Sequence, residues 1–387
     1  MNGARNPAPA AEPAQRGRMP LLDIAKGVAC AVIVGHHLSR YGTMPVGAFL
    51  LAPGLLGWLA DDGRLAVQVF LVIAGFLAAS SLAPDGLLRV ERPMARILQR
   101  YGRLVMPYLA ALTVSVLVAA LVRPWMAGDD VPAAPSIGQL LAHGLLIQDL
   151  LGYEALSTGV WYVAIDFQLF VLALVLMGLP AMLRRAPAPA AASYERWIPV
   201  ALVLCLATAS LLLFNRNADL DGTGFYFFGA YGLGMLAFWI GRATRASTWR
   251  SAIVLLALTG AGALAVDWRS RIATALVSAL LIAVAQRRGW LSLGRWPDAA
   301  MPLQRLGRMS YSLFLIHFPV LLATNAAAAQ LGPHPAWIDV LGLAATFGLS
   351  VAAAQLLHRS VELRPASWRV VAVLFAALLV SGMLVSL

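Results

Sequence analysis

The sequence predicts an all-α, polytopic transmembrane helix bundle with about 11 spans. Of its 387 residues, 60% are hydrophobic and only 12% are charged, and the mean hydropathy is +0.77. A soluble chain of this length has too little interior to bury that much apolar surface. The net charge is +11, but the basic residues recur in short clusters between apolar runs, as in the loops of membrane proteins. We therefore expect contact with membrane lipids and no nucleic-acid partner.

The pattern divides the chain into a tail, a membrane domain and a last helix. Residues 1–19 are Pro/Ala-rich and are expected to form a disordered cytoplasmic tail without a cleavable signal. Residues 20–366 form the membrane domain, in which a linker at 184–196 joins two helix groups, and residues 367–387 add a C-terminal transmembrane helix. The stretch 46–60 is too short to span and is expected to be re-entrant or interfacial. The predicted spans cover residues 21–40, 65–83, 104–122, 159–180, 197–214, 223–240, 251–267, 271–286, 308–329, 337–358 and 368–387.

Charge asymmetry between alternate loops predicts the orientation. With the N-terminus in the cytoplasm, the outer side holds only six of the 29 basic residues, namely Arg40, Arg64, Arg123, Arg216, Arg269 and Arg271. The outer loops hold acidic residues instead: Asp61, Asp62, Asp129, Asp130, Asp149, Glu154, Asp219 and Asp221. This asymmetry follows the positive-inside rule. It predicts a C-terminus on the outer side of the membrane, which in a bacterial inner membrane is the periplasmic side.

The first span carries ionisable groups at both ends. Asp23 and Lys26 lie near its start, and His36 and His37 near its end. Such groups are costly inside a membrane and are functional candidates for that reason. At about 100° per residue, Lys26 and His37 fall within roughly 20° of one helix face, whereas His36 points some 80° away from Lys26. We therefore prefer His37 over His36 as the reactive imidazole.

A stripe of arginines precedes the third span. Arg89, Arg92, Arg96, Arg100 and Arg103 recur every three or four residues and share one helix face. Two interpretations are open: a polybasic patch for anionic lipid headgroups, or a site for a phosphate-bearing ligand. Arg100 and Arg103 lie closest to the third span, and their planar guanidiniums suit a phosphate, so they favour the second interpretation.

The fourth span places a carboxylate inside the membrane. Asp166 lies roughly 10 Å below the outer surface and needs a partner, for which an imidazole at similar depth is the expected choice. A purely structural ion pair is the alternative. Ser157 and Trp161, four residues apart, share a face, although Trp161 also fits an interfacial anchor.

Spans five to eight hold nothing polar at depth except Ser, Thr and Gly, and are expected to be scaffold. The ninth span differs because it carries His317, either a hydrogen-bonded structural residue or part of the site. The tenth ends at Glu362, among arginines. Cys30 and Cys205 lie inside apolar spans, so neither a disulfide nor a metal site is expected.

Five motifs occur together in the chain. Their residues are Asp23, Lys26, Gly27 and His37; Arg100, Arg103 and Pro107; Ser157, Trp161 and Asp166; Gly307, Arg308, Ser310, Tyr311, His317 and Pro319; and Val361, Glu362 and Pro365. In this order they resemble the acyltransferase 3 family of bacterial integral membrane enzymes, from about Leu21 to Pro365. The chain departs from the family pattern with Lys26 for Arg, Asp166 for Glu, Val361 for Phe, and one extra residue before Pro365.

The resemblance implies an O-acyltransferase that moves an acyl group, expected to be acetyl, from cytoplasmic acyl-CoA to a hydroxyl of a periplasmic sugar, polysaccharide or glycolipid. Acyl-CoA is then a co-substrate, and no bound cofactor is expected. Arg100, Arg103 and Lys26 would bind the donor, and His37 would be a general base or acyl carrier oriented by Asp166, with His36 as a second candidate. The remaining motif residues would shape the site: Asp23, Ser157, Trp161, Ser310, Tyr311, His317 and Glu362.

Two other classes of function stay open. A transporter or permease of a small solute or lipid-linked glycan also places His and Asp within spans, although no inverted repeat is visible in the sequence. A catalytically silent subunit of a polysaccharide assembly system is the third possibility, and it would tolerate the loss of His37.

Overall fold

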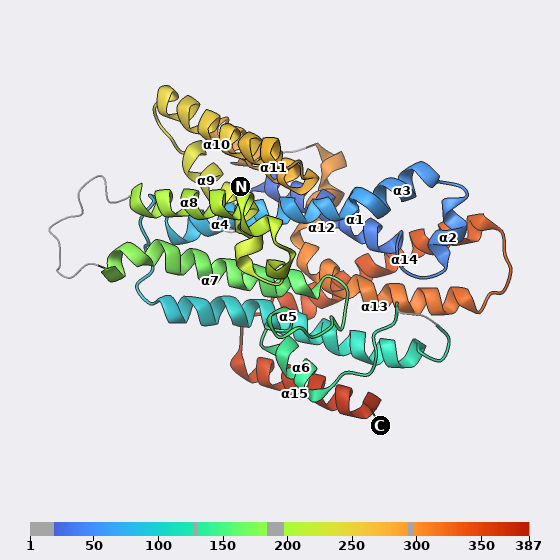
Figure 1. The fold of residues 1–387 in the computed structure, drawn as a ribbon. Coiled ribbons are helices and arrows are strands. Elements are labelled where there is room, and N and C mark those ends of the chain that lie inside the picture. The colour runs from blue at the N-terminus through green and yellow to red at the C-terminus, as the bar shows by residue number, and fades with distance from the viewer. Residues whose placement is uncertain (1–18, 127–129, 184–196, 293–296, 387) are drawn as a thin grey trace, which may run out of the picture.

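The computed structural model describes residues 19–126, 130–183, 197–292 and 297–386. Within these residues every regular element is a helix, and eleven helical stretches are long and apolar enough to cross a membrane. The long helices lie side by side in one bundle (Figure 1). The predicted fold class and number of spans are confirmed. The predicted tail, apart from Met19, and the 184–196 linker lie outside the described residues.

The spans are formed by long helices in chain order. They comprise α1 (Pro20–Leu38), α4 (Val67–Leu82), α5 (Pro93–Val122), α7 (Val160–Leu183), α8 (Trp197–Leu212), α9 (Gly224–Gly241), α10 (Ala246–Val266), α11 (Ser270–Arg287), α13 (Ser310–Ala329), α14 (Ala336–Leu357) and α15 (Trp368–Ser386). Shorter helices connect them: α2 (Met44–Phe49), α3 (Pro53–Asp62), α6 (Ile137–Gly144) and α12 (Met301–Arg308).

The segment between α1 and α4 is more helical than the sequence predicts. It forms α2 and α3, and α3 continues through a 3-10 turn, Gly63–Ala66, into α4. The helical stretch of the second span therefore starts at Pro53 rather than near residue 65. Val46, Leu50 and Leu55 are exposed on this segment, and such apolar surface suits contact with lipid.

The arginine stripe lies inside a helix that also crosses the membrane. α5 runs as one helix from Pro93 to Val122 and passes through Pro107 without ending. At about 1.5 Å per residue it is roughly 45 Å long, which exceeds the hydrocarbon core of about 30 Å. The part of α5 that carries Arg96, Arg100 and Arg103 therefore adds several helical turns to the apolar span.

Helices from the two sides of the linker interleave. α4 packs against α9 and α11, α5 against α13 and α15, and α1 against α12 and α13. The last helix, α15, also contacts α6, and the Trp368 ring stacks on Tyr101 of α5 with 6.0 Å between centroids. α15 thus supports the helix that carries Arg100.

Two helix crossings depend on glycine. A Cβ at Gly27 would overlap the Leu303 carbonyl, and one at Gly307 would overlap the Asp23 carbonyl, so α1 and α12 touch backbone to backbone. Gly75 and Gly234 allow the same approach between α4 and α9. Small residues let membrane helices pack this closely. The Gly27 crossing lies between Asp23 and His37 on the first span.

Replacement of Gly307 by alanine is expected to destabilise the protein by about 3 kcal/mol or more, because a backbone oxygen cannot move aside as a side chain can. The matched control is Gly262→Ala on α10, where an added Cβ meets nothing within 4 Å. Thermal unfolding of both variants in detergent measures the difference. Equal melting temperatures would show that the α1–α12 crossing tolerates a side chain.

Candidate active site

A cavity of about 540 Å³ lies at the end of α1 that carries Lys26. We call it the arginine cavity. Its charged and polar lining includes Lys26, Arg96, Gln99, Arg100, Arg103, Asp166, Arg308, Ser310, Tyr311 and Glu362. Five cations and two carboxylates therefore face one space, which suits a ligand with several negative charges.

A larger cavity, of about 1190 Å³, lies at the other end of α1. We call it the histidine cavity because His36 and His37 line it. Part of its wall comes from the segment that follows α5, including Asp130, Tyr153 and Ser157. The long loop between α5 and α7 therefore closes over this end of the bundle.

The two cavities share three lining residues, Ile33, Val67 and Phe314. Ile33 precedes His37 by one helical turn on α1, and Phe314 precedes His317 by one turn on α13. All three side chains are buried, with exposed fractions of 7% or less. We call them the apolar boundary. It separates the two cavities directly beside the histidines.

His37 contacts a second imidazole. Its Nδ1 lies 2.7 Å from Nε2 of His317, and the two rings are nearly parallel, with 8° between planes and 4.9 Å between centroids. Nδ1 of His317 lies 3.2 Å from the carbonyl oxygen of Leu313. His317 is fully buried and does not line either cavity.

This chain of contacts assigns the tautomers. A carbonyl oxygen can only accept, so Nδ1–H of His317 donates to Leu313, and Nε2 of His317 then carries a lone pair. Nδ1–H of His37 donates to that lone pair. The remaining nitrogen of His37, Nε2, is therefore the basic one. His317 holds His37 in the tautomer that a general base requires.

Asp166 contacts Arg100 rather than a histidine. One Nη of Arg100 donates to Oδ2 of Asp166 across 2.5 Å, and the guanidinium also lies 5.4 Å from the Phe170 ring centre. The Asp166 side chain is only 6% exposed, so it requires a cationic partner. The expectation that Asp166 orients His37 is wrong, because Arg100 lies inside α5 and reaches Asp166 on the arginine side of the boundary. His317 takes the orienting position.

Comparison with known families identifies the family to which the chain belongs. The model of one family, described as an acyltransferase domain, matches residues 20–359. The chain belongs to the acyltransferase 3 family. No curated protein and no solved structure matches it significantly. Glu362 lies just beyond the residues that the acyltransferase model covers.

The start of the acyltransferase domain is held by ion pairs. Lys26 lies 2.7 Å from Asp23, and Arg308 of α12 lies 3.9 Å from the same carboxylate. Lys26 and Arg308 both line the arginine cavity, while Asp23 does not. Asp23 thus holds two cations at the rim.

Three further motif residues line the arginine cavity and are hydrogen-bonded within the protein. Tyr311 donates to the Leu104 carbonyl across 2.7 Å. Glu362 accepts from Ser312 across 2.5 Å and lies 2.9 Å from Nδ1 of His358. Ser310 lines the same cavity, and its carbonyl lies near the Cys30 thiol. These contacts give Tyr311 and Glu362 structural roles in shaping the cavity wall.

The histidine cavity holds the other predicted residues. Trp161 stacks on Phe227, with 5.3 Å between ring centroids. The Ser157 hydroxyl is buried and has no hydrogen-bond partner among the described residues, so it is free to donate to a ligand. His36 lies 2.8 Å from the Leu59 carbonyl through Nδ1, which ties its ring to α3. The His36 ring lies 5.2 Å from the His37 ring, centroid to centroid, but its Nδ1 is bonded to Leu59 and not to the His37–His317 pair.

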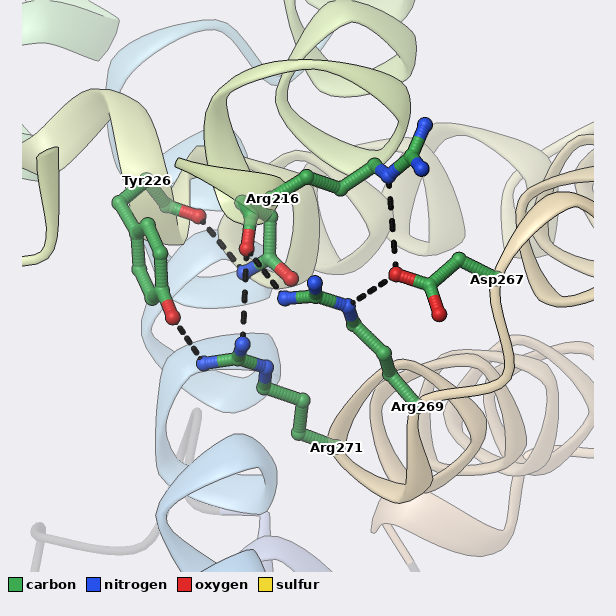
Figure 2. A network of polar contacts seen from close by, with 6 residues as sticks. Arg216, Tyr226, Asp267, Arg269 and Arg271 are labelled. Carbon is green, nitrogen blue, oxygen red and sulfur yellow. Dashed lines mark hydrogen bonds and ion pairs between the residues drawn. The ribbon is translucent and has the colours of Figure 1, made fainter. Parts of the chain in front are cut away.

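Two cavity residues, Arg269 and Arg271, were not among the predicted site residues. Both line the histidine cavity, although the spans around them were expected to be scaffold. Both guanidiniums donate to the Asn215 carbonyl, and Figure 2 shows them near each other. A signal was present in the sequence, because these are two of the few arginines on the acidic side of the predicted membrane.

Proposed function

We propose that this protein transfers an acyl group, expected to be acetyl, from acyl-CoA to a hydroxyl of a sugar, polysaccharide or glycolipid on the opposite side of the bacterial inner membrane. The observation that carries the proposal is the meeting of the arginine and histidine cavities beside the His37–His317 pair. Membership of the acyltransferase 3 family supplies the reaction class. In this proposal the arginine cavity faces the cytoplasm and the histidine cavity faces the periplasm.

The arginine cavity is proposed to bind the donor. Arg100 and Arg103 offer planar guanidiniums that suit the phosphates of CoA, and Lys26 and Arg308 add charge at the rim. The acyl end of the donor then points toward the apolar boundary. The thioester carbon has to reach His37 from this side.

The histidine cavity is proposed to bind the acceptor. Nε2 of His37 takes the proton of an acceptor hydroxyl as its oxygen attacks the thioester carbon. The C–S bond breaks, a C–O ester bond forms, and the proton passes from the imidazolium to the departing CoA thiolate. His317 accepts a hydrogen bond from His37 throughout, and Ser157 can donate a hydrogen bond to the substrates.

The proposal gives the apolar boundary the role of keeping water of the histidine cavity away from the thioester until the acceptor is bound. Phe314→Ala is then expected to raise hydrolysis of acetyl-CoA several-fold relative to transfer. The matched control is Phe318→Ala, because Phe318 is equally buried on the same helix but lines only the histidine cavity. The ratio of free CoA to acylated acceptor measures the effect, and an equal ratio in both variants would contradict this role.

The decisive experiment uses membrane vesicles that contain the protein, labelled acetyl-CoA and envelope glycans. We expect label in the glycans and release of stoichiometric CoA thiol, and neither in vesicles without the protein. CoA release without label would point to a hydrolase. Absence of both would remove the proposal.

A transporter is the second candidate, and one observation favours it. Two cavities on either side of a closed apolar boundary also fit alternating access to a central site. Uptake of a small solute or lipid-linked glycan by vesicles, without acyl transfer, would support the transporter. The five cations of the arginine cavity favour the donor role, since they match the charge of acyl-CoA.

A further inference from the structure

Three arginines and one carboxylate meet where η3 (Phe214–Arg216), α9 and the start of α11 come together. Figure 2 shows the carboxylate of Asp267 between Arg216 and Arg269. The Arg269 Nε lies 2.7 Å from Asp267, and the Arg216 Nε lies 3.6 Å from the same oxygen. One carboxylate therefore pairs with two guanidiniums.

Arg271 has no carboxylate partner among the described residues. It donates to the Tyr226 hydroxyl and to the Asn215 carbonyl, and its guanidinium lies 4.8 Å from the Tyr226 ring centre. Arg269 donates a further hydrogen bond to the Asn215 carbonyl, across 2.6 Å. Neutral groups thus hold Arg271 in place without cancelling its charge, whereas Arg269 shares the Asp267 carboxylate with Arg216. A guanidinium has five N–H donors, so each keeps donors for a ligand.

The two guanidiniums belong to a cavity wall rather than to open surface. Arg269 and Arg271 line the histidine cavity together with Tyr226 and Phe227, whereas Arg216 does not line it. The Arg269 side chain is 25% exposed, compared with 46% for Arg216. The two positive charges therefore face any ligand that occupies the cavity.

Four carboxylates from other segments line the same cavity: Asp130, Asp149 and Glu154 from the segment between α5 and α7, and Asp221 from the turn before α9. Asp130 accepts from the Gly42 amide across 3.0 Å, and Asp149 accepts from Gln148 across 2.7 Å. Burial and the charge of Asp221 raise the pKa of Asp149. By contrast, the pKa of Asp267 is lowered by its hydrogen bond to Arg269 and by the charges of the three arginines. The cavity therefore carries charges of both signs, and Arg269 and Arg271 at the start of α11 are two of its three arginines, with Arg64 as the third.

We propose that Arg269 and Arg271 form a binding site for an oxyanion, a carboxylate or a phosphate, carried by the acceptor in the histidine cavity. The inference rests on the proposed acyl transfer and specifies its acceptor as an anionic glycan or glycolipid. The two forks hold the anionic group beside Tyr226. The Trp161–Phe227 stack on the same cavity offers an aromatic face for the sugar ring.

The test uses membrane vesicles with the protein, labelled acetyl-CoA, and envelope glycans separated by anion exchange into an anionic and a neutral pool. We expect label in the anionic pool. Chemical reduction of carboxyl groups in that pool distinguishes the two oxyanions, since it removes a carboxylate acceptor and leaves a phosphate acceptor intact.

Single variants assign the site. Arg269→Met and Arg271→Met are each expected to raise the KM for the anionic pool by about tenfold or more while changing kcat less, as the loss of a charge-assisted hydrogen bond predicts. Arg271→Lys keeps the charge but not the planar fork, so its KM for the anionic pool is expected to lie between those of the unchanged protein and Arg271→Met. Arg216→Met removes the same charge from the same ion network outside the cavity and is the matched control. Binding of acetyl-CoA, measured on every variant, reports that the protein is folded.

The outcomes separate the two proposals. Label in the neutral pool alone would overturn the oxyanion site and leave acyl transfer standing. Label in the anionic pool with an unchanged KM in both methionine variants would also overturn it and assign the arginines to lipid headgroups. Absence of label in both pools would remove the acyl transfer and, with it, this inference.

Discussion

Replacement of His37 by alanine is expected to abolish acyl transfer in a protein that still inserts and folds. The imidazole is the base that the proposed reaction needs, and loss of a general base lowers rates by about 10²- to 10⁴-fold. His317 does not take its place, because it has one nitrogen bonded to Leu313 and the other to His37. Transfer of labelled acetyl groups in vesicles, with thermal unfolding in parallel, measures both effects.

His36→Ala is the control for this prediction. His36 lines the same cavity, but its Nδ1 is bonded to the Leu59 carbonyl. We expect most of the activity to remain. His317→Leu is expected to cause an intermediate loss, since it removes only the group that holds the tautomer of His37. Full transfer activity in His37→Ala would refute the assignment of the base. Loss of transfer activity in His36→Ala as well would also refute it.

Removal of the Arg100 guanidinium is expected to lower both stability and donor affinity. Arg100→Met leaves the buried Asp166 carboxylate without its partner, which costs about 3–5 kcal/mol in comparable buried pairs. The same change removes a cation from the arginine cavity. Thermal unfolding in detergent and direct binding of acetyl-CoA measure the two effects separately.

Two variants divide the structural role of Arg100 from its binding role. The double variant Arg100→Met, Asp166→Leu is expected to regain stability, because no unpaired charge remains, without regaining donor affinity. Arg103→Met is expected to weaken donor binding with little loss of stability, since Arg103 is exposed and no described carboxylate pairs with it. Unchanged acetyl-CoA affinity in Arg100→Met and Arg103→Met would reassign both arginines to lipid contact.

The structure also explains why some sequence predictions were wrong. Asp166 was placed near the histidines because its depth along α7 can be counted from the residues before it. Its neighbour could not be found in this way, since depth does not determine which helix faces the side chain. The sequence places Arg100 before the third span, because the hydropathy rises only after Arg103. The continuous α5 carries Arg100 into the bundle, where its charge meets Asp166.

The sequence by itself determined the eleven spans and membership of the family, and it predicts His37 rather than His36 as the reactive imidazole. Hydropathy and helical phase are properties of short segments, and the motifs are recognised by their order, so none of these requires knowledge of how the helices pack. Only the tertiary structure decided that His37 binds His317, 280 residues away, and that two cavities meet at Ile33, Val67 and Phe314. It also brought Arg269 and Arg271 into the histidine cavity. These features depend on how each helix is rotated and which helix lies beside it, and packing across the whole bundle sets both.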